Sequence, residues 1–285
     1  MTIWEAIVLG IVQGLTEFLP VSSSGHLVLF QGFFGLDDML LFDVLLHAGT
    51  LFAVLLVYWQ QVLDLFKKPF KKMGLLALAT LPAVVLMLLF RDVADTLFGG
   101  SYLCFGFLFT AILLLTTELL VKNYEKKKAL AAANGTDGAM SADGLSQLVP
   151  VPSLEIDWKT ALIMGAAQGF AALPPGVSRS GSTICAGVLC GKSRKEVADF
   201  SFMMSLPVIA GSTLVSIYEL IKGGGSAGFG VPQILTGMVF AFVSGVFAIK
   251  LMLKLIQKCN YKWFSLYLFL LATIVFLNEF VVQMW

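Results

Sequence analysis

The chain has 285 residues, of which 58% are hydrophobic and only 13% are charged, and its mean hydropathy is +0.88. Soluble domains carry roughly 25% charged residues, so the composition excludes an ordinary globular domain and predicts a protein surrounded by membrane lipid. The net charge of +1 gives no sign of a nucleic-acid partner, and none is expected.

Residues 3–34 form the first distinctive segment. Two apolar runs, 3–19 and 27–34, flank a break rich in Pro, Ser and Gly. Neither run comfortably spans the roughly 30 Å of a bilayer's hydrocarbon core. Non-helical backbone at that depth survives only when protein buries it or when it lines a watery cavity. The pattern predicts a re-entrant helical hairpin, and a pair of full spans kinked at proline is the alternative.

Three longer apolar stretches follow this hairpin, at about 44–59, 74–90 and 103–121. Residues 122–159 are polar and Gly-rich, which indicates a cytoplasmic linker. A second hairpin is expected at 160–190, followed by spans at about 197–221, 233–256 and 264–284. The chain therefore divides into a first repeat at 1–121, the linker at 122–159 and a second repeat at 160–285.

The two halves carry the same sequence pattern. Residues 6–14 match residues 161–169, Pro20 matches Pro175, and 22–25 match 178–181 after one inserted residue. Three spans per half is an odd number, so the second copy is predicted to be inverted relative to the first. The fold class is thus an all-α polytopic membrane protein, with about six transmembrane helices and two hairpins that meet at a central site. Lysine-rich connections on one side of this topology predict that side to be cytoplasmic.

The first hairpin carries chemically active groups in apolar surroundings. Gln13 and Glu17 are four residues apart and share a helix face, and Ser22, Ser23, Ser24 and Gly25 precede His26. Ionisable residues at membrane depth are functional candidates, which favours a role for Glu17 and His26. Free backbone N–H groups in the Ser/Gly break favour an anion. Helix capping by the serines and a core histidine are the structural alternatives.

The second hairpin reads Pro-Gly-Val-Ser178-Arg179-Ser180-Gly181, followed by Ser182 and Thr183. Arg179 is a cation that the predicted topology does not place at a membrane interface. Its planar guanidinium is suited to binding phosphate through two hydrogen bonds. A structural ion pair with Glu17 is the alternative, and both roles can alternate without and with substrate.

These motifs resemble those of the bacterial undecaprenyl-diphosphate phosphatase family, which is associated with bacitracin resistance. Gln13-x-x-x-Glu17 is similar to its (E/Q)xxxE element, and residues 20–26 and 175–181 look like its two signature loops. The resemblance implies hydrolysis of undecaprenyl diphosphate to the monophosphate carrier at the outer face of the inner membrane. It also implies a divalent cation, Mg²⁺ or Ca²⁺, and bacitracin resistance. Some relatives have Glu in place of Gln13, so metal binding here falls on Glu17.

The catalytic candidates are Glu17, Ser23, His26 and Arg179, with Ser23 preferred as nucleophile and His26 as general acid or base. Ser22, water and His26 itself remain alternative nucleophiles. Predicted substrate-binding residues are Gln13, Ser22, Ser24, Gly25, Ser178, Ser180, Gly181 and Thr183.

Other features support weaker interpretations. Asp43 and His47 are four residues apart near the outer end of a predicted span and are lesser candidates for lining the entrance. An inverted repeat with broken segments also suits a transporter or lipid flippase. A lipid kinase is disfavoured because the chain lacks a GxxxxGK[ST] element. The sequence leaves prenyl chain length and a homodimer open.

Overall fold

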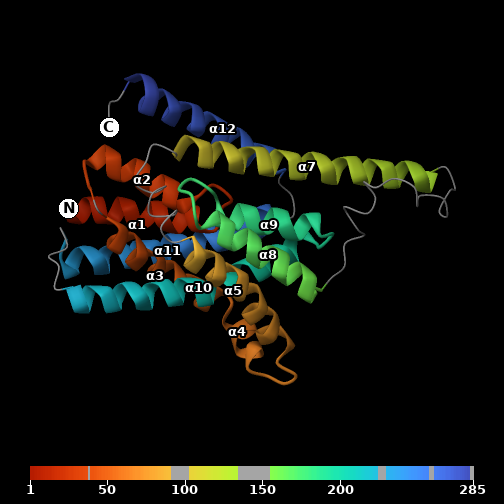
Figure 1. Cartoon of the computed structure of the whole chain (residues 1–285), viewed down its shortest axis with the longest axis horizontal. Helices are drawn as coiled ribbons and strands as arrows, with labels where there is room; N and C mark the ends of the chain where they lie inside the picture. The colour runs from red at the N-terminus through yellow and green to blue at the C-terminus, as the bar shows by residue number, and fades with distance from the viewer. Residues whose placement is uncertain (38, 91–102, 134–154, 224–228, 257–259, 283–285) are drawn as a thin grey trace.

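The computed structural model describes residues 1–37, 39–90, 103–133, 155–223, 229–256 and 260–282, and regular structure in these ranges is helical. Figure 1 shows the helices lying roughly along one direction. In chain order they are α1 (Ile3–Glu17), α2 (Ser23–Phe34), α3 (Leu40–Val57), α4 (Trp59–Leu65), α5 (Lys71–Leu89), α7 (Leu103–Ala133), α8 (Trp158–Ala171), α9 (Arg179–Leu189), α10 (Arg194–Gly223), α11 (Val231–Leu255), α12 (Lys262–Leu277) and the π-helical η1 (Asn278–Val282).

Six of the described helices, α3, α5, α7, α10, α11 and α12, are long and apolar enough to cross a membrane. This confirms the predicted number of spans and makes the chain a multi-pass membrane protein. Large apolar side chains on their outer faces, such as Leu88 and Leu214, are exposed in the isolated chain, as expected for surfaces that contact lipid.

Helix α7 is longer than the membrane span predicted within it. The span was predicted at about 103–121, and the helix continues through the first part of the predicted linker to Ala133. The additional turns are rich in Lys and Ala, which are good helix formers, and Glu118 pairs with Lys122 one turn later at 3.4 Å. Polarity marked the end of the membrane span and not the end of the helix. The rest of the predicted linker, residues 134–154, lies outside the described residues.

The first arm of each repeated segment packs closely on a helix of the other half of the chain. Helix α1 lies against α11, and α8 lies against α5. A side chain at Gly10 would overlap the carbonyl oxygen of Gly237, and one at Gly165 would overlap that of Ala79. Gly10 and Gly165 are equivalent in the repeated sequence. Small residues therefore let both pairs of backbones approach closely, as is common between membrane helices.

The two breaks in the repeated segments also share their local structure. Ser22 caps α2 by accepting a hydrogen bond from Gly25 N (3.3 Å), and Ser178 caps α9 by accepting one from Gly181 N (3.0 Å). Left-handed glycines follow both helices, Gly35 with φ 62° and Gly191 with φ 76°. The repetition in sequence therefore reproduces the same serine cap and the same glycine at the helix end twice.

The breaks meet each other inside the protein. The hydroxyl of Ser180 donates to the carbonyl oxygen of Leu19 at 2.9 Å. A side chain at Gly25 would lie 3.1 Å from the Cα of Gly176, so the two loops touch at their backbones. The end of α1 and the starts of α2 and α9 consequently converge at one place.

The start of α8 is fixed by Asp157. Its carboxylate accepts a hydrogen bond from Thr160 N (2.8 Å) and pairs with Lys192 Nζ at 2.8 Å. The Lys192 ammonium and the Thr160 N–H lower the pKa of Asp157 to about 2. Lys192 follows α9, so this contact ties the entry and the exit of the second repeated segment together.

The glycine contacts predict different outcomes for two chemically identical substitutions. Gly10→Ala should lower thermal stability, by about 1–3 kcal/mol, because the added methyl overlaps the backbone of α11. Gly211→Ala in α10 meets no atom within 4 Å and should leave stability unchanged or raise it. Thermal unfolding of both variants in detergent tests this, and equal melting temperatures would contradict the close packing of α1 on α11.

Candidate active site

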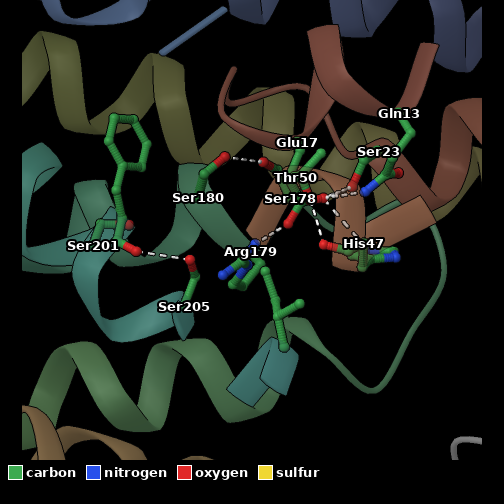
Figure 2. Close-up of polar contacts among 12 residues, drawn as sticks. Gln13, Glu17, Ser23, His47, Thr50, Ser178, Arg179, Ser180, Ser201 and Ser205 are labelled. Carbon is green, nitrogen blue, oxygen red and sulfur yellow. Dashed lines mark hydrogen bonds and ion pairs between the residues drawn. The ribbon is translucent and has the colours of Figure 1, made fainter. Parts of the chain in front are cut away.

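The carboxylate of Glu17, at the end of α1, is the centre of a polar cluster (Figure 2). Its side chain is 2% exposed, and both oxygens are engaged. Oε2 accepts hydrogen bonds from Gln13 Nε2 at 3.0 Å and from the Ser23 hydroxyl at 2.5 Å. Oε1 pairs with Arg179 Nη2. Three elements, α1, α2 and α9, therefore bring their polar residues to one carboxylate.

Arg179 is the first residue of α9 and lies at the meeting point of the two breaks. Its side chain is 19% exposed, so the guanidinium retains some access from outside. The ion pair that the sequence offered as an alternative role for Arg179 is present. Each charge of the pair compensates the other, and burying either one alone would cost a large desolvation free energy.

Ser22 and Ser23 differ in what their side chains do. Ser22 has a left-handed backbone (φ 69°), which is uncommon for a residue with a side chain, and its hydroxyl caps α2. The Ser23 hydroxyl instead donates a hydrogen bond to Glu17 Oε2. Of the two serines proposed as nucleophile, Ser23 is thus the one next to a basic group.

His26 faces away from this cluster. Its Nδ1 bonds the Ser22 carbonyl oxygen at 2.7 Å, and its Nε2 lies 2.6 Å from the hydroxyl of Tyr267 in α12. The imidazole stacks on the Tyr267 ring and contacts the edge of Phe107. The structure therefore brings together Glu17, Ser23 and Arg179 among the predicted catalytic residues, and holds His26 against α12. The acid or base role of His26 stays a prediction.

A second histidine, His47 of α3, occupies the position beside Glu17. Its Nε2 lies 3.4 Å from Glu17 Oε2, and its Nδ1 lies 2.7 Å from the backbone carbonyl oxygen of Asp43. The sequence indicated His47 only as a lesser candidate for lining an entrance. Its signal was a histidine four residues from a carboxylate within an apolar span, but nothing local linked it to Glu17.

The remaining predicted substrate-binding residues hold the two breaks in shape. Ser178 Oγ and Ser180 Oγ lie 3.3 Å apart, as Ser22 Oγ and Ser24 Oγ do at 3.4 Å. The Ser178 N–H donates to Thr110 Oγ1 of α7 at 3.0 Å. Thr183 faces α10, where its hydroxyl lies 2.6 Å from that of Ser201. Gly25 and Gly181 supply the N–H groups that the capping serines accept.

The donor set is compatible with a hard divalent cation. In the described part of the chain no group of three or more His, Cys, Asp or Glu residues gathers as a metal site. Beside Glu17, however, Gln13 Oε1 is buried with no hydrogen-bond partner among the described residues. One carboxylate and one amide oxygen suit Mg²⁺ or Ca²⁺, since Mg²⁺ commonly takes only one or two carboxylates and completes its shell with phosphate and water.

Comparison with known proteins agrees with this site. A family model described as "Bacitracin resistance protein BacA" matches residues 6–274. A protein of Halothermothrix orenii named undecaprenyl-diphosphatase is 38% identical, covering 96% of this chain and 97% of its own. Proteins of the same name from Carboxydothermus hydrogenoformans (36% identical, 96% and 97% covered) and Parabacteroides distasonis (35% identical, 94% of each) are also similar.

The buried ion pair predicts a non-additive effect on stability. Arg179→Ala should destabilise the fold by about 3–5 kcal/mol, because it leaves the Glu17 carboxylate buried without its cation. Glu17→Gln combined with Arg179→Ala should be more stable than Arg179→Ala alone, since no uncompensated charge remains. Unfolding of the two single variants and the double variant in detergent measures the coupling, and additive losses would contradict it.

Proposed function

We propose, because this chain belongs to the BacA family, that it is a membrane enzyme hydrolysing undecaprenyl diphosphate to undecaprenyl phosphate and phosphate. The observation that carries the proposal is the Ser23 hydroxyl donating to Glu17 Oε2 at 2.5 Å, beside the guanidinium of Arg179. A nucleophile, a base and a phosphate-binding cation are the groups that phosphoanhydride cleavage needs.

In the first step, the Ser23 oxygen attacks the terminal phosphorus and its proton passes to Glu17. The bond between that phosphorus and the bridging oxygen breaks, so the lipid monophosphate leaves and phosphoserine forms at Ser23. Arg179 supplies charge neutralisation on the transferring phosphoryl group, because its fork matches two phosphate oxygens. Backbone N–H groups at the start of α2 add donors in the same place.

In the second step, water attacks the phosphoserine phosphorus and the bond from phosphorus to the Ser23 oxygen breaks. As that bond breaks, the protonated Glu17 returns the proton that it took earlier to the Ser23 oxygen, and the protons of the water stay with the released phosphate. The products are phosphate and the restored hydroxyl. His26, hydrogen-bonded to the Ser22 carbonyl, holds the turn that presents Ser23 and remains the second candidate for acid or base.

A divalent cation is part of the proposal. Glu17 and the unpartnered Oε1 of Gln13 would hold it, and bound there it would neutralise charge on the diphosphate. The glutamine is neutral, so this chain offers the cation one negative ligand fewer than a relative with Glu at that position. Affinity for the ion should therefore depend strongly on the phosphate that completes its shell.

The proposed topology is an inverted repeat with two re-entrant hairpins. It is supported by α1 and α8 starting from opposite sides of the molecule in Figure 1, with α1 beside the N-terminus and α8 where the chain returns from α7. It is also supported by the packing of each first arm on a helix of the other half, with α1 on α11 and α8 on α5. Lysines at the start of α5 and the end of α7 favour that side as cytoplasmic.

With that orientation, the protein lies in the bacterial inner membrane and its site opens toward the outer face. Hydrolysis there would regenerate the monophosphate carrier for cell-wall synthesis. It would also remove the diphosphate lipid on which bacitracin acts, which accounts for the association of the family with bacitracin resistance.

Phosphate release from a long-chain prenyl diphosphate by detergent-purified protein tests the function. Ser23→Ala and Glu17→Gln should each lower kcat, by roughly 10²- to 10⁴-fold, because they remove the nucleophile or its base. Ser212→Ala, whose hydroxyl bonds only its own helix backbone, is the matched control and should retain activity. A chelator should abolish release, and added Mg²⁺ or Ca²⁺ should restore it. No release by the folded wild type with either cation would reject the proposal.

A further inference from the structure

His47 lies at the site without a role in the chemistry described so far. We propose that His47 is a positioning residue, which keeps the Glu17 carboxylate on the Ser23 hydroxyl when Arg179 turns from Glu17 to the substrate phosphate. This inference rests on the proposed hydrolysis of a prenyl diphosphate. It concerns α3, a helix that contributes no residue to the two repeated motifs.

The need for such a residue follows from how Glu17 is held. Arg179 fixes Oε1, whereas Gln13, Ser23 and His47 approach Oε2. A guanidinium binds a diphosphate more strongly than a single carboxylate. Substrate binding therefore removes the contact between Arg179 and Glu17 Oε1. Glutamate has three rotatable side-chain bonds, and a base that swings out of hydrogen-bond reach cannot take the proton of Ser23.

Once Arg179 has turned away, two of the described groups remain to hold Oε2 against Ser23. Gln13 lies on the same helix as Glu17 and moves with it. His47 belongs to a separate helix, so its contact fixes the carboxylate relative to the rest of the protein. The contact between His47 Nε2 and Glu17 Oε2, at 3.4 Å, therefore restrains the Glu17 side chain against moving away from Ser23, which Gln13 alone does not do.

His47 is itself well anchored. Its Nδ1 lies 2.7 Å from the Asp43 carbonyl oxygen, which orients the ring, as hydrogen bonds to a catalytic or ligating histidine commonly do. The Asp43 carboxylate in turn accepts a hydrogen bond from Gln31 of α2 at 2.6 Å. Helix α2 begins with Ser23, so this bond connects the helix of the nucleophile to the helix that positions the base.

The exposure of the groups is consistent with this role. The Glu17 side chain is 2% exposed and that of His47 is 25% exposed. The histidine is thus the more exposed of the two side chains, and it contacts Oε2, the same oxygen that accepts the hydrogen bond from Ser23. Its contact to Oε2 is separate from that of Arg179, which pairs with Oε1.

The expected signature is a loss of kcat with little change in KM, because phosphate binding by Arg179 does not require His47. His47→Leu keeps the bulk of the side chain but has no nitrogen, and should lower kcat by roughly 10- to 100-fold. His47→Gln places an amide N–H near the position of Nε2 and should recover most of that loss. Phe52→Ala, which shortens an exposed side chain on the same helix, is the matched control and should leave both kcat and KM unchanged.

The experiment measures kcat and KM for phosphate release from a long-chain prenyl diphosphate by the four full-length proteins in detergent, with melting temperatures recorded in parallel. Rescue of kcat by Gln but not Leu, at equal melting temperatures, supports the positioning role. A rise in KM at constant kcat would overturn it, since His47 would then contact the substrate. Equal activity of Leu and Gln variants would also overturn it, and an inactive wild type would reject the hydrolase itself.

Discussion

The ion pair between Glu17 and Arg179 is the interaction on which the arrangement of this protein depends. The carboxylate belongs to the first repeat and the guanidinium to the second. Glu17 ends α1 and Arg179 begins α9, so each lies beside the non-helical loop of its own repeat. Neither charge could remain buried alone, because an unpaired ion in an apolar medium is strongly destabilising. Folding of the two halves against each other and assembly of the site are therefore the same event.

Close helix packing keeps this pair in register. Because α1 lies on α11 and α8 lies on α5, the helix that ends at Glu17 and the helix that precedes the break before Arg179 are each held by the other half. Glycines at 10 and 165 allow these contacts, and a methyl group at either would meet backbone and not a movable side chain. The two halves are interlocked, so Glu17 and Arg179 cannot separate by simple parting of two domains. Local motion of the Arg179 side chain is the change that the geometry permits.

Much of this was predictable from sequence, and the failures have physical causes. Span number followed from apolar length, and the meeting of Glu17, Ser23 and Arg179 followed from the repeated breaks. The histidines were different. His26 is three residues from Ser23, yet Tyr267, distant in sequence, holds its imidazole. His47 reaches Glu17 only because α3 packs beside α1, a tertiary contact with no local signature. The length of α7 beyond residue 121 was not predicted, because the helix-forming residues there continue after the hydrophobic stretch ends.

Under the proposed chemistry, the same ion pair explains why Glu17 acts as a base only after substrate has bound. Without substrate, Arg179 neutralises Glu17 and makes it a weak base toward Ser23. When the diphosphate draws the guanidinium away, the carboxylate stays in its buried place and loses its pairing with Arg179. A carboxylate in that position has a greater affinity for a proton, and Ser23 is the donor already in contact with it. Binding and activation are thus coupled through one side chain, which requires that Glu17 be held in place when its partner leaves.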